Sequence, residues 1–319
     1  MCFQKVILFK KVLITAPWFT KSCLEDLRKN FEVTQNTKKT WFSEKELIEI
    51  IGQYDAVIAG LDDFTPSVIR KGSNLKIIAR RGIGYDKINL LSCRERGILV
   101  TNTPVPEEHL AVGEFAVGLI LDLIRNITAS HISLQNNSWE REAFVGKDLA
   151  NSTVGILGLG NIGGTTARIL KAMGAGVIYC DPYVEDGRYR KVDTETLFKE
   201  SDVISVHLPK TQETIGLVNA YKLSLMKKGS FLVNTSRGEV LRDMDVVEAL
   251  ENGTLRGVAT DVFSEEPPNG NILLSRKDVI ATPHIAGFSE NSFLHIDTTC
   301  VENITDVLLK GTLPRFQIP

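Results

Sequence analysis

The stretch Val154-Gly155-Ile156-Leu157-Gly158-Leu159-Gly160-Asn161-Ile162-Gly163, in the middle of the 319-residue chain, decides the fold class. Its first four residues are apolar or small and predict a short buried strand. Three glycines follow in the pattern G-x-G-x-x-G, and the residues after them, through Leu170, predict a helix. A strand, a glycine turn and a helix in this order begin a βαβ unit, so the stretch predicts an α/β fold with a parallel sheet.

The glycine turn also predicts a binding site for a dinucleotide. Gly158 allows the tight turn, Gly160 lets a pyrophosphate approach the backbone, and Gly163 lets the helix pack close to the strand. The helix begins near Asn161 and Ile162, where unpaired N–H groups and a partial positive charge favour a phosphate. The structural alternative is a glycine turn that serves packing alone.

An acidic residue follows the next predicted strand, residues 176–180. Asp181 lies 23 positions after Gly158, close to the spacing of about 20 residues at which such folds place a ribose-binding acid. A carboxylate there accepts hydrogen bonds from the ribose hydroxyls and repels a 2′-phosphate, which favours NAD over NADP. Two alternatives stay open, since Asp181 could cap a helix and Arg188 or Arg190 could reach a 2′-phosphate.

Two series of short apolar strands alternate with predicted helices along the chain. The predicted strands are residues 11–17, 56–60, 75–79 and 97–101, then 153–157, 176–180, 203–206, 230–233 and 258–260. Continuous apolar strands are typical of parallel sheets that helices cover on both faces. The two series predict two doubly wound domains, although one large sheet would also fit. Residues 107–136 predict one long helical stretch, and residues 289–310 a closing helix.

Composition excludes several classes of protein. The net charge is −2 and no basic run dominates a segment, which disfavours nucleic acid and membrane surfaces as partners. Five cysteines lack metal-ligand spacing, so we expect no metal site and reduced thiols in the cytoplasm. The apolar N-terminus is interrupted by Lys5, and no apolar run reaches the length of about 20 residues that a membrane span needs. Neither a signal peptide nor a membrane span is therefore expected.

Three residues after strands of the second series suggest acid–base chemistry. Arg237 follows residues 230–233, Glu266 follows the strand-like residues 260–263, and His284 follows a strand at 279–280. A carboxylate beside an imidazole favours its charged form, which can protonate a ketone oxygen as a hydride arrives and act as base in reverse. An arginine can hold a substrate carboxylate. Each residue alone also has a structural explanation: a capped loop histidine, a surface ion pair and a solvated turn.

Six motifs in order resemble the D-isomer-specific 2-hydroxyacid dehydrogenase family over nearly the whole chain. They are R-R-G-I-G-Y-D at 80–86, G-I-L-G-L-G-N-I-G at 155–163, H-L-P at 207–209, N-T-S-R-G at 234–238, D-V-F with E-P at 261–267, and P-H-I-A-G at 283–287. The resemblance implies that Arg237, Glu266 and His284 are the catalytic residues. It also implies a Rossmann NAD-binding domain, residues 107–287, inserted in a flavodoxin-like substrate-binding domain made of residues 1–106 and 288–319.

The resemblance assigns further residues to ligands. Ile83 and Gly84 hold the substrate carboxylate through their backbone N–H groups, and Arg80 lies near the substrate. The remaining cofactor contacts are His207 and Thr214 near the adenosine, Asp261 near the nicotinamide carboxamide, and Thr235 and Gly287. Family members are usually homodimers, and the long helix from Glu107 resembles part of their interface.

The expected activity is NAD-dependent interconversion of a small 2-keto acid and a D-2-hydroxy acid. D-3-phosphoglycerate dehydrogenase is an alternative that needs cations for the phosphate, for which Arg80, Arg81 and Lys87 are available. A non-catalytic NAD(H)-sensing protein like the corepressors that resemble this family is an alternative of another class. Two positions depart from the family, since Arg242 stands where an aspartate is usual and Pro106 has no N–H to offer a substrate.

Overall fold

The computed structural model describes residues 9–319, which form two compact units. Unit 1 consists of the described residues up to Glu108 together with Ser289–Pro319, and unit 2 is His109–Phe288. The sequence places the corresponding boundaries after residues 106 and 287. Lys5, the residue that interrupts the apolar N-terminus, and Cys2 lie outside the described residues.

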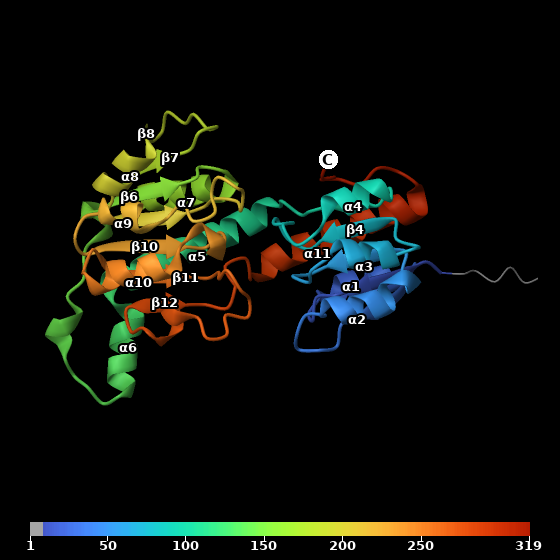
Figure 1. Ribbon diagram of the computed structural model, residues 1–319, viewed down its shortest axis with the longest axis horizontal. Helices are drawn as coiled ribbons and strands as arrows, with labels where there is room; N and C mark the ends of the chain where they lie inside the picture. Colours follow the sequence, from blue (N-terminus) through green and yellow to red (C-terminus); the bar gives the residue numbers. More distant parts are fainter. Residues whose placement is uncertain (1–8) are drawn as a thin grey trace, which may run out of the picture. The chain divides into compact units, whose positions relative to one another are not determined.

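Unit 1 is built on a five-stranded parallel sheet (Figure 1). Its strands are β1 Lys11–Ile14, β2 Glu32–Gln35, β3 Ala56–Ala59, β4 Ile77–Arg80 and β5 Leu99–Thr101. They lie in the order β2-β1-β3-β4-β5, which is the flavodoxin-like order. Strand β2 was not predicted from the sequence, because this edge strand alternates exposed and half-buried residues and lacks an apolar run.

Helices cover both faces of the sheet in unit 1. They are α1 Lys21–Arg28, α2 Glu44–Ile50, α3 Pro66–Lys71, α4 Leu90–Glu95 and α11 Glu290–Thr305, with the short turns η1 Ile51–Gln53 and η6 Asp306–Lys310. Residues of α2, α3 and α4 pack on one face, in a cluster that includes Leu47, Val68 and Cys93. Residues of α1 and α11 pack on the other face, in a cluster that includes Leu27 and Ile304. The closing helix of the chain thus returns to the sheet formed by the first hundred residues.

Unit 2 contains a separate seven-stranded parallel sheet, so the alternative of one large sheet is wrong. Its strands are β6 Thr153–Leu157, β7 Gly176–Cys180, β8 Arg190–Lys191, β9 Val203–Val206, β10 Ser230–Asn234, β11 Leu255–Thr260 and β12 Val279–Ala281. The order β12-β11-β10-β9-β6-β7-β8 is the Rossmann order with one strand added at an edge. The fold prediction of two doubly wound domains, with a Rossmann domain inserted in a flavodoxin-like one, is confirmed.

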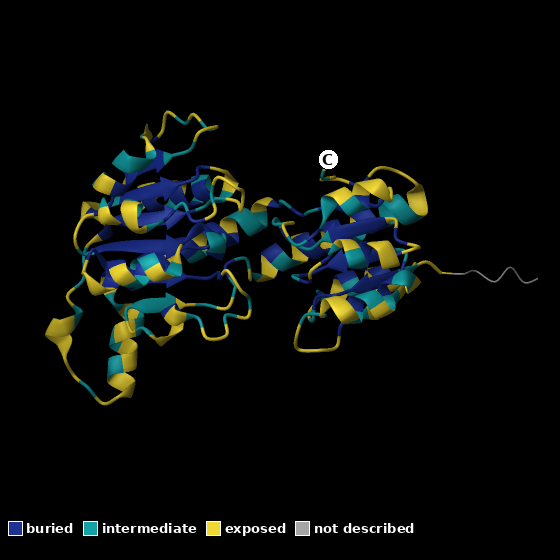
Figure 2. Cartoon of the chain, viewed as in Figure 1, coloured by how far each residue is buried: buried dark blue, intermediate teal, exposed yellow. Residues whose placement is uncertain are grey.

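The central strands β6, β9 and β10 of unit 2 are buried between two helical layers, whereas the edge strands β8 and β12 contain no buried residue (Figure 2). Its helices and turns are α5 Pro106–Arg125, which begins within unit 1, α6 Ile127–Gln135, η2 Arg141–Phe144, η3 Leu149–Asn151, α7 Asn161–Ala172, α8 Thr194–Glu200, α9 Ala220–Ser224, η4 Gly238–Val240, α10 Asp243–Glu251 and η5 Ile272–Ser275. Residues of α5 and α7 pack on one face of the sheet. Residues of α8, α9 and α10 pack on the other. Pro106, which cannot donate a hydrogen bond, is the first residue of α5, where a helix leaves its N–H groups unpaired.

The long helical stretch predicted over residues 107–136 is two helices. Asn126 separates α5 from α6 and has a φ of +56°, a left-handed conformation that asparagine tolerates. The carboxylate of Asp122 accepts hydrogen bonds from the backbone N–H and the hydroxyl of Thr128, at 2.7 and 2.6 Å, and so holds the start of α6. Gly113 lies inside α5 and serves packing. A Cβ there would lie 2.8 Å from Thr165 of α7, so the glycine permits the close approach of the two helices.

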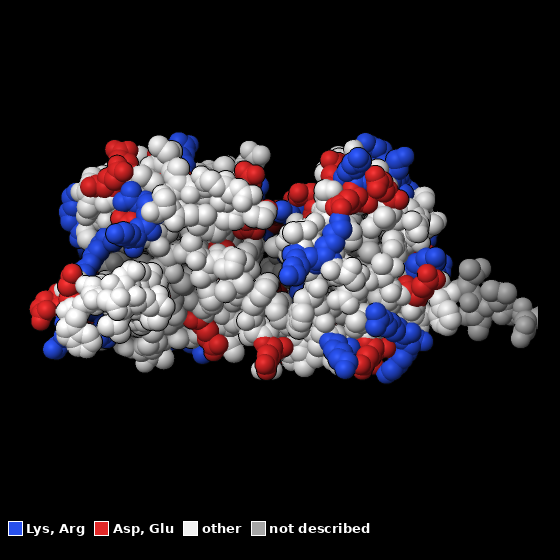
Figure 3. Space-filling view, turned by 90° about the horizontal axis from the view of Figure 1, so that it is seen from below, with Lys and Arg blue, Asp and Glu red and all other residues white. Residues whose placement is uncertain are grey.

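Charged side chains of both signs lie side by side on the face drawn in Figure 3.

Among the helices of residues 9–319, none is both long enough and apolar enough to cross a bilayer. Within the same residues, no three His, Cys, Asp or Glu side chains are grouped as a metal ion would require. Cys23, Cys93, Cys180 and Cys300 are free thiols.

Candidate active site

The carboxyl ends of the unit 2 strands gather the predicted site residues of that unit. The chain proceeds from β6 to β7 in one direction and returns to place β9 on the other side of β6. Ligands of open α/β sheets bind outside the carboxyl ends of the strands at such a switch point. The glycine turn follows β6 and His207 follows β9, so both lie at this point.

The glycine turn has the geometry that its three glycines predict. Gly158 has a φ of +94°, and a Cβ there would lie 2.6 Å from the carbonyl oxygen of His207. A Cβ at Gly163 would lie 2.0 Å from the carbonyl oxygen of Gly158, so the start of α7 packs directly on the turn. At Gly160, by contrast, a Cβ would meet no described atom within 4 Å. The turn is therefore closed on its inner side and open over Gly160, at the start of α7, where a phosphate would approach.

Asp181 is tied to the glycine turn. One carboxylate oxygen accepts a hydrogen bond from the Leu159 N–H at 2.8 Å, and the other accepts from the N–H groups of Tyr183 and Val184 at 2.8 and 3.0 Å. These bonds fix a half-buried carboxylate beside the turn, where it could meet ribose hydroxyls. The two arginines that could reach a 2′-phosphate are both paired, Arg188 with Asp186 at 2.5 Å and Arg190 with Glu200.

Two buried polar atoms near the switch point have no hydrogen-bond partner among the described residues. They are Nδ1 of His207, after β9, and Oγ1 of Thr235, after β10. Leaving such groups unpaired costs free energy unless a water or a ligand satisfies them. The open space over Gly160, the carboxylate of Asp181 and these two atoms form a donor and acceptor set that fits a dinucleotide.

We expect stability to depend on pH through His207. Burial lowers the pKa of its imidazole from 6.5 to about 4, and Nε2 lies 2.9 Å from the Ser205 hydroxyl. Between these pKa values the unfolded chain binds the proton and the folded chain does not, so stability falls as the pH decreases from about 6.5 toward 4. Lowering the pH from 7 to 5 should reduce the free energy of unfolding through this group by on the order of 1–2 kcal/mol. Urea titrations at both pH values should show a smaller decrease for His207→Gln; an equal decrease would contradict the assignment.

The carboxylate of Glu266 pairs with the imidazole of His284. Glu266 Oε2 lies 2.8 Å from His284 Nδ1, and Oε1 accepts a hydrogen bond from the Phe263 N–H at 3.1 Å. Both side chains are partly exposed, so the pair is accessible. His284 has a φ of +54°, an uncommon conformation for a residue with a side chain, and such backbone outliers concentrate at functional sites.

Asp261 holds the loop that carries His284. Its buried carboxylate accepts hydrogen bonds from the Thr282 hydroxyl at 2.5 Å and from the N–H groups of Ile285 and Ala286 at 2.9 and 2.8 Å. Its carbonyl oxygen accepts from the His284 N–H at 2.9 Å. Burial raises the pKa of the Asp261 carboxyl, and the hydrogen bonds oppose that rise. This loop-holding role was not predicted, and a contact with the nicotinamide stays a prediction.

The loop with Arg237 lies beside the segment that leads to Glu266. A Cβ at Gly238 would lie 2.0 Å from the backbone carbon of Phe263, so only glycine permits this approach. Asn234 organises the loop, because its amide donates to the Arg237 carbonyl at 2.9 Å and its oxygen accepts from the Ser236 hydroxyl at 2.8 Å. The Arg237 guanidinium donates to the Ser236 carbonyl at 2.7 Å. The loops with Arg237, Glu266 and His284 are therefore connected at one edge of the sheet.

Thr214 and Gly287 lie farther along the same edge. The hydroxyl of Thr214 donates to the carbonyl oxygen of Pro209 at 2.6 Å, which fixes the turn after the H-L-P motif. Gly287 is half-buried and follows Ala286 at the end of the loop that Asp261 holds. Their contacts with a cofactor stay predictions.

In unit 1, the substrate residues named from the sequence follow β4. Arg80 ends the strand, and its guanidinium donates to the carbonyl oxygen of Arg81. The Ile83 carbonyl accepts a hydrogen bond from the Asn102 amide at 2.8 Å. Within residues 9–319, the N–H groups of Ile83 and Gly84 donate no hydrogen bond. Two neighbouring free donors are suited to hold a carboxylate.

Comparison with known proteins gives the family. The model described as "D-isomer specific 2-hydroxyacid dehydrogenase, NAD binding domain" matches residues 117–286, which lie within unit 2. This chain belongs to that family. Unit 2 thus contains the family's NAD-binding domain, and NAD is the cofactor that the family description names.

Two relatives show how much of the chain is shared. A hydroxypyruvate reductase from Thermotoga maritima is 39% identical over 265 residues, which cover 81% of this chain and 86% of that relative. A D-3-phosphoglycerate dehydrogenase from Synechocystis sp. is 36% identical over 284 residues, or 87% of this chain. The match covers 51% of that dehydrogenase, so the chain spans about half the length of this relative.

Solved structures share the fold over nearly the whole chain. The TT0316 protein from Thermus thermophilus has a TM-score of 0.89 and 31% identity, and the match covers 97% of this chain and 100% of that one. The D-lactate dehydrogenase from Escherichia coli has a TM-score of 0.83 and 28% identity, with coverage of 98% and 100%.

Proposed function

We propose that the protein is an NAD-dependent oxidoreductase that interconverts a small 2-keto acid and a D-2-hydroxy acid by hydride transfer. The observation that carries this proposal is the Glu266–His284 pair, at 2.8 Å, on the sheet edge that also carries the glycine turn. A histidine held by a carboxylate is a general acid and base suited to neutral pH.

Residues of this chain transfer the proton and bind the substrate. NAD supplies or accepts the hydride when it is bound. Since Glu266 engages Nδ1 of His284, Nε2 is the ring nitrogen left to give a proton to the ketone oxygen, and to take it back in the reverse reaction. Arg237 holds the substrate carboxylate and polarises the adjacent carbonyl with its planar guanidinium. In unit 1, the free N–H groups of Ile83 and Gly84, with Arg80 nearby, are suited to bind a substrate carboxylate.

A screen of NADH oxidation tests the proposal. Glyoxylate, hydroxypyruvate, pyruvate and longer 2-keto acids are offered to the full chain, and we expect turnover of at least one of them. Tight NADH binding without turnover of any keto acid would refute the enzyme and favour the NAD(H)-sensing alternative.

D-3-phosphoglycerate dehydrogenase is a second candidate because the Synechocystis relative has that name. This candidate also fits the comparisons, but Arg81 is paired with Asp297 at 2.5 Å and Lys87 lies 3.7 Å from Asp63. Two of the three cations named for a phosphate therefore already face carboxylates. We propose an unphosphorylated substrate, and the same screen should show higher kcat/KM for hydroxypyruvate than for 3-phosphohydroxypyruvate.

We expect Asp181→Ser to weaken the preference for NAD over NADP by about tenfold or more, because one repelled 2′-phosphate corresponds to roughly 1.4 kcal/mol or more. The measurement is the ratio of kcat/KM for NADH and NADPH. Asp193→Asn is the matched control, since Asp193 is a carboxylate of the same unit that caps α8 through the Thr196 N–H at 2.9 Å. A wild type that already prefers NADPH would contradict the ribose assignment.

We further propose a homodimer that works in the cytoplasm. Support comes from α6, which has no buried residue and exposes Ile127, Ile132 and Leu134 by half or more. Exposed apolar side chains on one short helix are typical of an interaction surface. Sedimentation at micromolar concentration should give twice the chain mass, and a monomer would contradict the proposal. The four free thiols fit a reducing compartment.

A further inference from the structure

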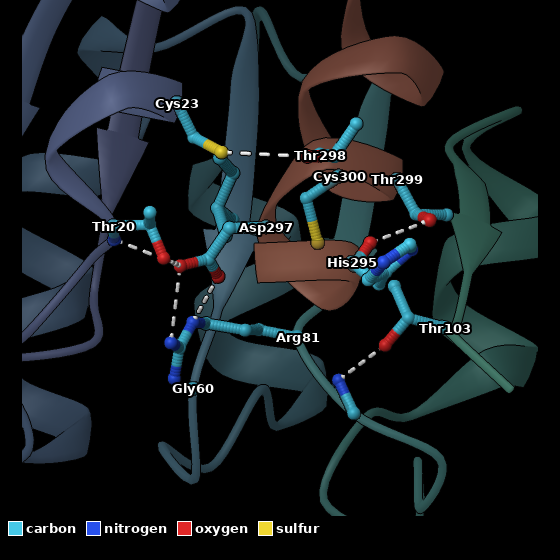
Figure 4. A network of polar contacts seen from close by, with 12 residues as sticks. Thr20, Cys23, Gly60, Arg81, Thr103, His295, Asp297, Thr298, Thr299 and Cys300 are labelled. Carbon is cyan, nitrogen blue, oxygen red and sulfur yellow. Dashed lines mark hydrogen bonds and ion pairs between the residues drawn. The ribbon is translucent and has the colours of Figure 1, made fainter. Parts of the chain in front are cut away.

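Arg81, one residue after β4, points away from solvent toward α11. Its side chain is 8% exposed, and its partner Asp297 is fully buried. Arg81 Nε lies 2.5 Å from Asp297 Oδ1, and Nη2 lies 3.2 Å from Oδ2 (Figure 4). Two parallel bonds between a planar guanidinium and a carboxylate fix orientation as well as distance.

The same carboxylate joins a third segment of unit 1. Asp297 Oδ2 accepts hydrogen bonds from the N–H and the hydroxyl of Thr20, at 2.8 and 2.7 Å, immediately before α1 (Figure 4). The guanidinium lies 4.4 Å from the ring centre of Phe293 and 5.4 Å from that of Trp18. Aromatic rings attract the cation and keep water from the pair, which strengthens the ion pair.

The loop after Arg81 is held on its other side as well. Gly82 has a φ of +131° and donates its N–H to the Thr103 hydroxyl at 2.8 Å. The Ile83 carbonyl accepts from Asn102 at 2.8 Å. The free N–H groups of Ile83 and Gly84 therefore follow a backbone segment that is anchored at three consecutive residues.

We propose that Arg81 is a positioning residue for substrate binding. Its ion pair with Asp297 fixes the start of the loop so that the N–H groups of Ile83 and Gly84 stay aimed at the substrate carboxylate. Arg81 itself touches no substrate, because a buried carboxylate and aromatic rings occupy its guanidinium. The inference rests on the proposed function, in which those two N–H groups bind a 2-keto acid.

Arg81→Lys and Asp297→Asn test this inference in the full chain. Lysine keeps the charge without the fork, and asparagine keeps the shape and one acceptor oxygen, so both variants should fold. We expect the KM for glyoxylate to rise about tenfold in Asp297→Asn and less in Arg81→Lys, since small displacements of positioning groups have effects of this size. The kcat should stay within about twofold of the wild type, and the NADH dissociation constant should not change.

Substrates with different side chains distinguish two explanations for a raised KM. Either the N–H groups that bind the carboxylate are displaced, or the pocket that binds the substrate side chain has changed. If the donors are displaced, the KM values of all 2-keto acids and the inhibition constant of oxamate, a carboxylate analogue, should rise by a similar factor. A rise for some side chains only would overturn the proposal.

Asp55→Asn is the matched control. Asp55 also pairs with a cation, Lys10 at 3.0 Å, and also accepts a backbone hydrogen bond, from the Lys11 N–H at 2.9 Å, but it lies at the amino end of β3. We expect it to lower the melting temperature without changing KM. Unchanged KM values in Asp297→Asn and Arg81→Lys would overturn the role of Arg81 alone, whereas a wild type without any turnover would overturn the proposed function and this inference together.

Discussion

Replacing His284 with alanine is expected to lower kcat for 2-keto acid reduction by about 10²- to 10⁴-fold, the usual contribution of a positioned general acid. The substitution removes the imidazole that Glu266 orients at 2.8 Å. It should leave NADH binding unchanged, because the glycine turn and Asp181 belong to other loops. Single-turnover absorbance of NADH measures the chemical step, and NADH fluorescence measures binding.

The backbone hydrogen bonds that hold the His284 loop do not involve the His284 side chain, so His284→Ala should keep the loop in place. The His284 N–H donates to the carbonyl oxygens of Asp261 and Thr282, at 2.9 and 3.1 Å, and neither bond needs the side chain. The chain offers a matched control in a second His–Glu pair, His295 with Glu107 at 3.6 Å in unit 1. His295→Ala should keep wild-type turnover. Full activity in His284→Ala would show that another group supplies the proton.

The sheet strands were predictable where apolar runs continue without interruption. All core strands of both units coincide with such runs, because helices on both faces leave no polar side to alternate. The edge strands β2 and β8 were not predicted, because Glu32–Gln35 alternates exposed and half-buried residues without an apolar run and Arg190–Lys191 is polar and exposed. The position of the break, at Asn126, was not predicted because the hydrogen bonds from Thr128 to Asp122 that support it depend on a three-dimensional turn.

The contacts of the site residues also depend on three-dimensional structure that the sequence does not show. Spacing and motif order predicted which loops carry chemistry, since each loop directly follows a strand. They did not predict that Asp261 binds the loop residues 282–286, because those partners come from the next strand and not from a neighbouring position. The pair of Arg81 and Asp297 joins residues 216 positions apart, so no local pattern indicates it. The sequence left Arg81 as a candidate to bind a phosphate, whereas in the structure its guanidinium pairs with Asp297.

We expect Arg237→Met to lower kcat/KM for 2-keto acids by about 10²- to 10³-fold, since the substitution removes two or more hydrogen bonds to a charged carboxylate at about 1.5–3 kcal/mol each. Both KM and kcat should change, because the guanidinium binds the carboxylate and also polarises the ketone. Arg237→Lys should recover only part of the loss, since an ammonium cannot offer the same fork. Steady-state kinetics with glyoxylate and NADH measure all three proteins.

Arg242 provides the control for Arg237 within the same loop region. It is exposed, and its Nε lies 2.8 Å from the position that a Cβ at Gly216 would occupy, so it contacts another turn of unit 2. Arg242→Met removes the same charge only five residues away, yet it should change kcat/KM by less than about threefold, because a surface charge contributes little. Equal losses in Arg237→Met and Arg242→Met would mean that the loop needs net positive charge and not a guanidinium at one place. A large loss in Arg237→Met alone would tie the chemistry to the Arg237 guanidinium itself.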